Sequence, residues 1–242
     1  MKLPCLLVNQ NVKQGNSTYP LKFGDARIIS TTETGLSRSR NMLLKNAVGD
    51  ICIIGDDDVI YLPNYEQIIQ NAYKELPNAD IIVFRFTHEI GKETRIKHKK
   101  IKRLRMWNIS KSASVEITFK RERVLSKNIT FNNNIGLGAK FPSGEENAFL
   151  ADALRAGLKI YFYPKTICYA VEAHGIKNKN QVDDYLITKG ASYHCIYKNS
   201  FWFYSLGFII LKKRKLFPKL SIIKAYSLMK QGRKKYKELE KI

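Results

Sequence analysis

The chain has 242 residues, of which 44% are apolar, and this is enough chain to bury one sizeable core. A disordered chain, a collagen and a disulfide scaffold are excluded, since the sequence is rich in apolar residues and holds only four cysteines, which lie far apart. The net charge of +21 points to a partner with clustered phosphates, which nucleic acid, anionic lipid and phosphorylated substrates all present.

Short apolar runs alternate with helix-like stretches in the first half of the chain. This pattern is typical of βαβ units with a mainly parallel sheet. The predicted strands are Cys5–Val8, Arg27–Ser30, Ile51–Ile54 and Ile81–Phe86. The predicted helices are Ser37–Ala47 and Pro63–Leu76.

A basic segment with eight cations and one acidic residue, Lys92–Arg105, follows and is expected to form an exposed loop or hairpin. Further strands are predicted at Ser114–Phe119, Lys159–Tyr163 and Thr166–Val171, with a helix at Asn147–Leu158. Helices dominate from Gln181 onward. We therefore predict two regions, an α/β domain at residues 1–175 and a helical, basic region at 176–242.

The longest apolar run, Phe201–Leu211, leads directly into Lys212–Lys241, which holds twelve basic and two acidic residues. Eleven residues are too few to span a bilayer core, which needs about 20 in a helix. One interpretation is a segment lying in the membrane interface with its basic flank on anionic headgroups. The other is a helix buried against the domain and followed by a solvated basic tail.

Three adjacent carboxylates, Asp56, Asp57 and Asp58, directly follow the apolar strand Ile51–Ile54 and Gly55. Their mutual repulsion is relieved by a divalent cation, and the carboxyl end of a strand is where α/β sheets bind ligands. This favours a site for Mg²⁺ or Mn²⁺ on a phosphate group. The alternative is an acidic surface turn.

Two helix starts and one histidine carry further polar groups. Residues Gly35–Asn41 offer N–H groups, serines and arginines to a phosphate, or form an ordinary serine-capped helix. Glu145 and Glu146 form a carboxylate pair in which one could act as a base, while the other favourably meets the helix dipole. His174 is a further candidate metal ligand or phosphate contact.

The order of these motifs is more specific than any one of them. The motifs are Gly-Leu-Ser-x-Ser-Arg-Asn at residues 35–41, Asp-x-Asp at 56–58 and Gly-Glu-Glu at 144–146. Together they resemble family 2 glycosyltransferases of the GT-A fold, over roughly Cys5–Val171. The resemblance implies an α/β, Rossmann-like and mainly parallel sheet flanked by helices, here with a helical basic C-terminal extension. It also implies transfer of a sugar from a nucleotide-sugar donor, expected to be a UDP-sugar, to an acceptor hydroxyl with inversion.

The resemblance also assigns roles on the donor side. Asp56 would hold the ribose side of the donor, with Asp57 beside it and Arg40 lining the donor pocket. Asp58 would bind Mg²⁺ or Mn²⁺ on the diphosphate, with Asp56 and His174 as further candidate ligands. A cation at this position would offset the negative charge that develops on the leaving nucleotide diphosphate.

On the acceptor side, Glu146 matches the position of the family's base, which is usually an Asp, and Glu145 is a possible substitute. A second departure lies at the N-terminus, since Met1–Gln10 resembles the family's second strand and the first family strand and helix are expected to be missing. An inactive, truncated copy that acts as a scaffold is therefore one alternative to the enzyme.

The expected setting is bacterial capsule, exopolysaccharide or lipopolysaccharide synthesis on a glycan or lipid-linked acceptor. Residues Met1–Gln10 hold no signal-peptide pattern, so we expect a cytoplasmic protein, peripheral at the anionic inner face of the cell membrane. A nucleic-acid-binding protein is the other alternative. It is disfavoured because, apart from Trp107, most Tyr and Phe residues lie in apolar runs instead of alternating with Lys and Arg, and no nucleic-acid partner is expected.

Overall fold

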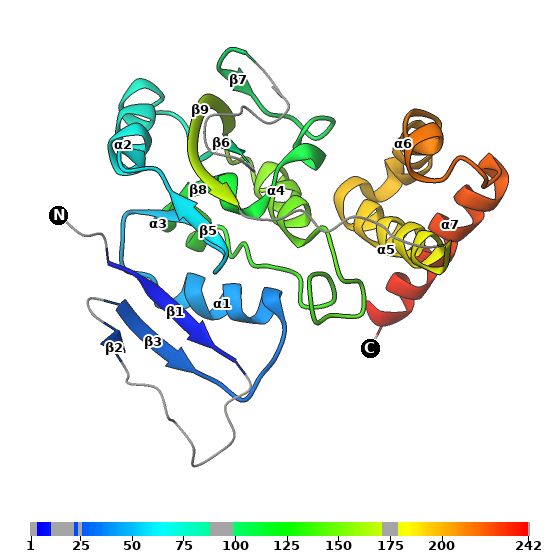
Figure 1. The fold of residues 1–242 in the computed structure, drawn as a ribbon, viewed down its shortest axis with the longest axis horizontal. Helices are drawn as coiled ribbons and strands as arrows, with labels where there is room; N and C mark the ends of the chain where they lie inside the picture. The colour runs from blue at the N-terminus through cyan, green and yellow to red at the C-terminus, as the bar shows by residue number, and fades with distance from the viewer. Residues whose placement is uncertain (1–3, 11–21, 24–25, 88–98, 171–178, 242) are drawn as a thin grey trace.

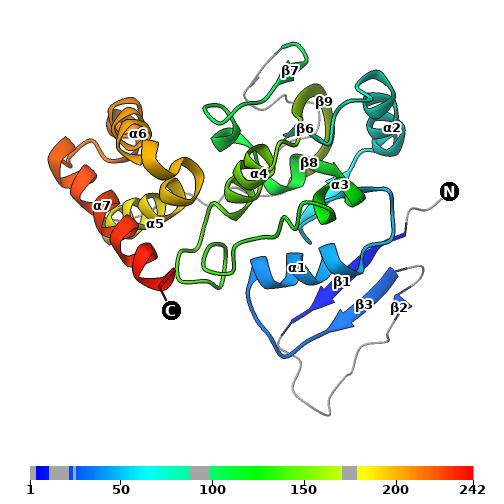
Figure 2. The ribbon, with the colours of Figure 1, turned by 180° about the vertical axis from the view of Figure 1, so that it is seen from behind.

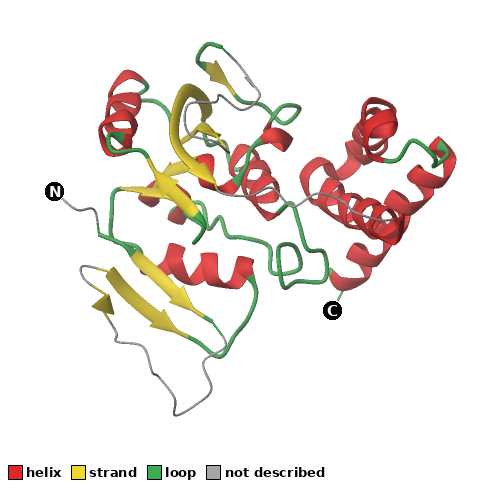
Figure 3. Cartoon of the chain, in the orientation of Figure 1, coloured by secondary structure: helices red, strands yellow, loops and turns green. Residues whose placement is uncertain are grey.

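The computed structural model describes residues 4–10, 22–23, 26–87, 99–170 and 179–241. Strands gather at one end of the molecule and the C-terminal helices at the other (Figures 1 and 3). The short 3₁₀ turns lie between larger elements, at Ile109–Lys111 (η1), Ser114–Glu116 (η2) and Lys198–Ser200 (η3).

A small sheet at the N-terminal end has the strand order β1-β3-β2. Its strands are β1 (Leu6–Asn9), β2 (Lys22–Phe23) and β3 (Ala26–Ser30). Strands β1 and β3 are parallel, as predicted for Cys5–Val8 and Arg27–Ser30, and β2 is antiparallel to β3. Helix α1 (Leu36–Asn46) lies between this sheet and the rest of the domain in both views (Figures 1 and 2). It matches the predicted helix Ser37–Ala47.

The larger sheet has the order β4-β8-β6-β9-β5, with β7 paired to β9. Its strands are β4 (Ile51–Ile53), β5 (Val59–Tyr61), β6 (Ile81–Thr87), β7 (Lys102–Arg103), β8 (Ile117–Lys120) and β9 (Ile160–Ala170). Only the β6/β9 pair is parallel among the pairings described in this sheet. The prediction of a mainly parallel sheet is therefore wrong for these strands, although the α/β fold with flanking helices is confirmed. The reason is that chain direction leaves no mark on the apolar pattern of a strand.

One strand was predicted as two. The predicted strands Lys159–Tyr163 and Thr166–Val171 fall on one strand, β9, which runs through Pro164 without a break. The register between β6 and β9 shifts on either side of Arg85, so more residues of β9 than of β6 lie in this stretch. A bulge of this kind tolerates a proline because it leaves backbone groups outside the regular ladder.

The core lies on both faces of the larger sheet. Alternate residues of β6 point to opposite faces, so Ile81 and Val83 join one apolar cluster and Ile82 and Phe84 join another. Helix α4 (Glu145–Arg155) covers the first face, with Phe149 fully buried. Helix α2 (Tyr65–Glu75) covers the second. Burial on both faces explains why the first four residues of β6, Ile81–Phe84, are all apolar. The short helix α3 is Arg121–Leu125.

Three helices form the C-terminal end: α5 (Lys179–Tyr197), α6 (Phe201–Leu216) and α7 (Ile222–Leu239). Helices α5 and α7 approach closely at two glycines, because a Cβ on Gly190 would lie 2.0 Å from the Met229 carbonyl oxygen, and one on Gly232 would lie 1.9 Å from the Ile187 carbonyl oxygen. The predicted helices from Gln181 onward are confirmed. The boundary at residue 175 lies outside the described residues and stays a prediction.

Candidate functional site

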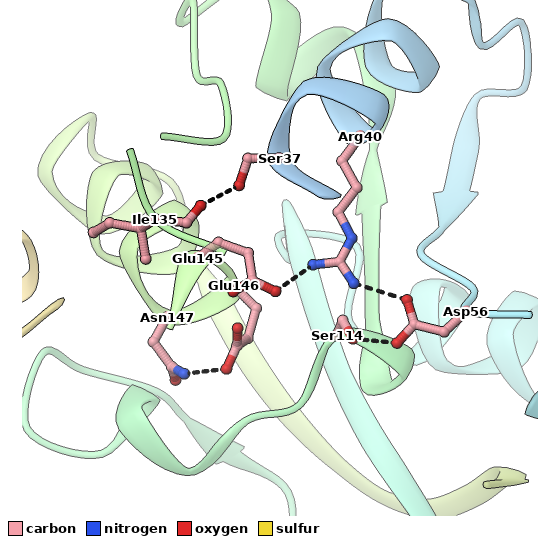
Figure 4. Close-up of polar contacts among 8 residues, drawn as sticks. All are labelled: Ser37, Arg40, Asp56, Ser114, Ile135, Glu145, Glu146 and Asn147. Atoms are coloured by element: carbon pink, nitrogen blue, oxygen red, sulfur yellow. Dashed lines mark hydrogen bonds and ion pairs between the residues drawn. The ribbon is translucent and has the colours of Figure 1, made fainter. Parts of the chain in front are cut away.

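Arg40 on helix α1 links two distant carboxylates (Figure 4). Its side chain is buried, and the whole residue is only 3% exposed. Its Nη2 donates a hydrogen bond to Asp56 Oδ1 and its Nη1 donates one to Glu145 Oε1, both at 2.8 Å. The guanidinium also lies over the Phe131 ring, with Cζ 5.5 Å from the ring centroid. One cation therefore ties the loop after β4 to the start of α4, and a buried charge between two carboxylates is compensated.

The three aspartates after β4 differ in their surroundings. Asp56 is half-buried, and its second carboxylate oxygen accepts a hydrogen bond from Ser114 Oγ at 2.8 Å. Asp57 and Asp58 form the turn before β5 and are exposed. Asp56 is therefore held in place by its partners, whereas the carboxylates of Asp57 and Asp58 face solvent.

The loop before α4 is fitted tightly to its neighbours by two glycines with positive φ. Gly136 has φ +117°, and a Cβ there would lie 2.7 Å from Ser37 Oγ, whose hydroxyl donates a hydrogen bond to the Ile135 carbonyl oxygen. Gly144 has φ +101°, and a Cβ there would lie 2.8 Å from Ser192 Oγ. Glycine adopts a positive φ without strain and has no Cβ to clash at these short distances. The two glycines therefore let the loop pack closely enough to bring the start of α4, with its two glutamates, into the site.

Glu146 has the surroundings of a proton acceptor. It is half-buried, and its Oε1 accepts a hydrogen bond from the Asn147 side-chain amide at 2.5 Å. Burial and the adjacent charge of Glu145 raise the pKa of Glu146 to about 7, against the opposing effect of Lys189 and Arg40. A carboxyl group with such a pKa is a matched acceptor for a proton near neutral pH.

Helix α5 contributes groups beside this carboxylate that the sequence analysis missed. Ser192 Oγ donates a hydrogen bond to the Ser143 carbonyl oxygen at 2.6 Å, at the start of α4. Lys189, one turn earlier on α5, is half-buried and interacts electrostatically with Glu146 and Glu145, and burial lowers its pKa. A lysine and a serine three apart on a helix are common on solvent-facing surfaces, so the sequence alone holds no signal for this role.

Residues 9–159, more than half of the chain, match the family model described as glycosyl transferase family 2. The chain belongs to this family.

Solved structures of S. aureus TarS share the fold of this family 2 chain. TarS residues 1–349 in complex with UDP-GlcNAc match with a TM-score of 0.58 and 14% identity, covering 81% of this chain and 58% of that one. The complex of the same TarS segment with UDP matches with a TM-score of 0.56 and 13% identity, covering 86% and 64%. The chain thus spans less than two thirds of the length of these relatives. No significant match to a curated protein was found.

The structure of this glycosyltransferase family member brings together several of the predicted residues. Arg40, Asp56 and Glu145 form one cluster, with Glu146 directly beside Glu145. The described residues hold no group of three or more His, Cys, Asp or Glu side chains that could bind a metal ion. His174 lies outside the described residues.

The motif at residues 35–41 contains a second residue that positions the site, Asn41, which the sequence pattern alone gives no role. The Asn41 side chain donates a hydrogen bond to the Phe131 carbonyl oxygen at 2.8 Å and accepts one from the Phe131 backbone N–H at 2.7 Å. This pair of bonds fixes the segment whose ring lies beneath Arg40. The Arg-Asn pair therefore works as a unit, in which one residue holds the carboxylates and the other holds the aromatic ring.

Proposed function

We propose that the chain transfers a sugar from a nucleotide-sugar donor, a UDP-sugar, to an acceptor hydroxyl with inversion at the anomeric carbon. The observation that carries this proposal is the bridge of Arg40 between Asp56 and Glu145. Arg40 joins Asp56, which we assign to the donor, to Glu145, which directly precedes the proposed base Glu146 at the start of α4. The family membership and the fold shared with TarS, crystallised with UDP-GlcNAc and with UDP, support the choice of donor.

In this reaction Glu146 accepts the proton of the acceptor hydroxyl as its oxygen forms a bond to the anomeric carbon. The bond from that carbon to the diphosphate breaks on the opposite face, and the nucleoside diphosphate leaves with the electron pair. Glu145 keeps its ion pair with Arg40, and its negative charge helps hold the pKa of Glu146 at about 7. The two glutamates thus have separate roles, one as base and the other as a fixed neighbour.

Asp58 would hold Mg²⁺ or Mn²⁺ on the donor diphosphate. Its carboxylate is an exposed, hard oxygen ligand on the turn after β4, and such ions commonly bind one or two carboxylates together with substrate phosphates and water. Asp58 together with the phosphate oxygens of the donor therefore forms a ligand set that fits these ions. When bound, the cation supplies positive charge that offsets the charge developing on the leaving group.

The acceptor in this proposal is a glycan or a lipid-linked glycan in bacterial capsule, exopolysaccharide or lipopolysaccharide synthesis. The protein would act in the cytoplasm, peripheral at the inner face of the cell membrane. The basic segment Lys212–Lys241 supports this setting, since clustered cations attract phosphate-bearing lipids.

Calorimetric titration with UDP and with GDP, each with and without Mn²⁺, tests the donor site. We expect Mn²⁺-dependent binding of UDP by the wild type, and loss of the Mn²⁺ dependence in Asp58→Asn. Asp50→Asn, which changes another exposed carboxylate just before β4, is the matched control and should bind as the wild type does. Absence of binding by either nucleotide in the presence of Mn²⁺ would contradict the enzyme and favour a scaffold.

A further inference from the structure

Helix α6 exposes a continuous stripe of large apolar side chains to solvent. Trp202 is 59% exposed, Phe203 61% and Ile210 58%, and Leu206 lies between them on the same side. Positions 202, 206 and 210 are spaced by four residues, so they lie on one face of the helix. Isolated exposed apolar residues are ordinary, but an aromatic and aliphatic stripe along one helix face marks an interaction surface.

The opposite side of α6 holds the helix firmly in the domain. Phe201, Ser205 and Ile209 have no exposed surface, and Phe201 and Ile209 belong to the main apolar cluster. The Tyr204 ring stacks on Tyr197 at the end of α5, with a centroid distance of 3.7 Å and an angle of 7°. The exposed stripe is therefore presented by a packed helix.

The stretch of chain that carries this stripe holds charges of one sign. No acidic residue occurs between Asp184 and Glu238, whereas thirteen lysines and arginines do. Arg214 and Lys215 are exposed in the last turn of α6, directly after the stripe. Helix α7 and the residues just after it line a separate groove of about 430 Å³, with five cations and one acidic residue: Lys230, Arg233, Lys234, Lys237, Glu238 and Lys241.

We propose that the exposed stripe of α6, with the cations that follow it, docks on the surface of an anionic lipid bilayer. Trp and Phe side chains favour the boundary between headgroups and acyl chains, and Lys and Arg favour the layer of lipid phosphates above it. In this proposal the helix lies along the bilayer surface. Among the described residues, no helix is long and apolar enough to span a membrane.

Charge disfavours a second copy of the chain as the occupant. A two-fold dimer through the stripe would bring the same surface of both copies together. The chain that carries the stripe holds no acidic residue between Asp184 and Glu238, so the exposed cations that follow the stripe in the two copies would repel one another. Anionic lipid, by contrast, is complementary to both the apolar and the charged part.

Docking would also fix the position of the acceptor side of the site relative to the membrane. Helix α5, which is stacked against α6 through Tyr197, carries Ser192 and contacts the start of α4 beside Glu146. The docked helices would therefore hold the acceptor side of the site near headgroup level. This inference deepens the proposed function and rests on it only for the acceptor. The docking itself needs no nucleotide, so vesicle binding and UDP binding can fail separately.

Tryptophan emission gives a direct test, because Trp107 and Trp202 are the two tryptophans of the chain. In Trp107→Phe, the remaining Trp202 should shift to shorter wavelength with phosphatidylcholine vesicles that contain about 30 mol% phosphatidylglycerol, and should be quenched by brominated acyl chains. Vesicles of phosphatidylcholine alone should give a much smaller shift. In the matched variant Trp202→Phe, the remaining Trp107, which is 64% exposed, should not respond.

Cosedimentation with the same vesicles tests the charges. Arg214→Gln with Lys215→Gln should weaken partition about 30-fold, whereas the control pair Lys99→Gln with Lys100→Gln, also exposed, should change it far less. The docking proposal would be overturned by any of three results: equal partition to neutral vesicles, no effect of the Arg214 and Lys215 changes, or a Trp202-dependent dimer in sedimentation. Preference for nucleic acid over anionic vesicles would also overturn it.

Discussion

The cations of the two ends of the molecule are placed in opposite ways. In the family 2 segment, Arg40 is buried between Asp56 and Glu145 and faces inward. In the C-terminal helices, Arg214 and Lys215 are exposed on an acid-free stretch. The overall charge of +21 hides this difference, since a paired buried cation organises a site while unpaired exposed cations attract an anionic partner.

Glu146, the proposed proton acceptor, gives the largest expected effect and tests the inward-facing end. Glu146→Gln should lower kcat by about 10²- to 10⁴-fold, because a neutral amide cannot accept the proton of the acceptor hydroxyl. UDP binding by calorimetry should stay as in the wild type. Persistence of transfer in Glu146→Gln together with its loss in Glu145→Gln would show that the base is Glu145.

Removing the buried cation should cost stability at the same end. Arg40→Met leaves Asp56 and the buried Glu145 without their partner, so the free energy of unfolding should fall by about 3 kcal/mol. Urea unfolding measures this loss. The exposed neighbour Arg38→Met should change it by less than about 0.5 kcal/mol.

A double variant separates lost pairing from lost packing. Glu145→Gln added to Arg40→Met removes one isolated charge and should recover part of the loss. If the double variant is no more stable than Arg40→Met alone, the ion pair with Glu145 does not stabilise the fold in the way that the geometry indicates.

Local patterns predicted most of the larger helices and strands, and where the acidic turn and the glutamate pair lie. They did so because an apolar run followed by Gly55 and three aspartates needs no knowledge of distant residues. The first half of the predicted strand Ser114–Phe119 is instead the 3₁₀ turn η2, and β5 was not predicted. The strand directions in the larger sheet were beyond such patterns, since parallel and antiparallel strands have the same alternation of side chains. The prediction of two strands at β9 is wrong, because a bulge lets one strand continue through Pro164.

Contacts between residues far apart in the chain could not be predicted from the sequence either. Arg40 and Glu145 are 105 residues apart, and nothing in either motif shows that one guanidinium serves both Glu145 and Asp56. The contact of Ser192 with Ser143 comes from a helix outside the family-matched residues. For Phe201–Leu211 the structure agrees with part of each interpretation, since one side of the run is buried against the domain and the other is exposed. Its place at a membrane stays a proposal.

A change at the contact between α5 and α7 tests what holds the outward-facing end together. Gly190→Ala would place its Cβ 2.0 Å from the Met229 carbonyl oxygen, so the two helices must separate, at a cost of about 1–3 kcal/mol in urea unfolding. Gly207→Ala, in α6 with open space around it, should instead be neutral or stabilise by up to about 1 kcal/mol. Equal stability of both variants would mean that backbone contact does not hold these helices.

The smallest expected effect concerns the pKa of Glu146, which the charge of Lys189 on α5 lowers. It tests whether the C-terminal helices influence the site. Below the pKa of Glu146, which is about 7, kcat should rise about tenfold per pH unit and then level off above it. Lys189 lowers this pKa, so Lys189→Met should move the midpoint of the profile to higher pH, whereas the exposed Lys230→Met should leave it unchanged.

The raised pKa of Glu146 also makes the free energy of unfolding depend on pH. Since the folded-state pKa of Glu146 is raised, its contribution to stability is complete below pH 4.5 and is lost as the pH rises through about 7. In Lys189→Met this loss should extend to higher pH, and an unchanged midpoint in both measurements would show that α5 does not tune the base.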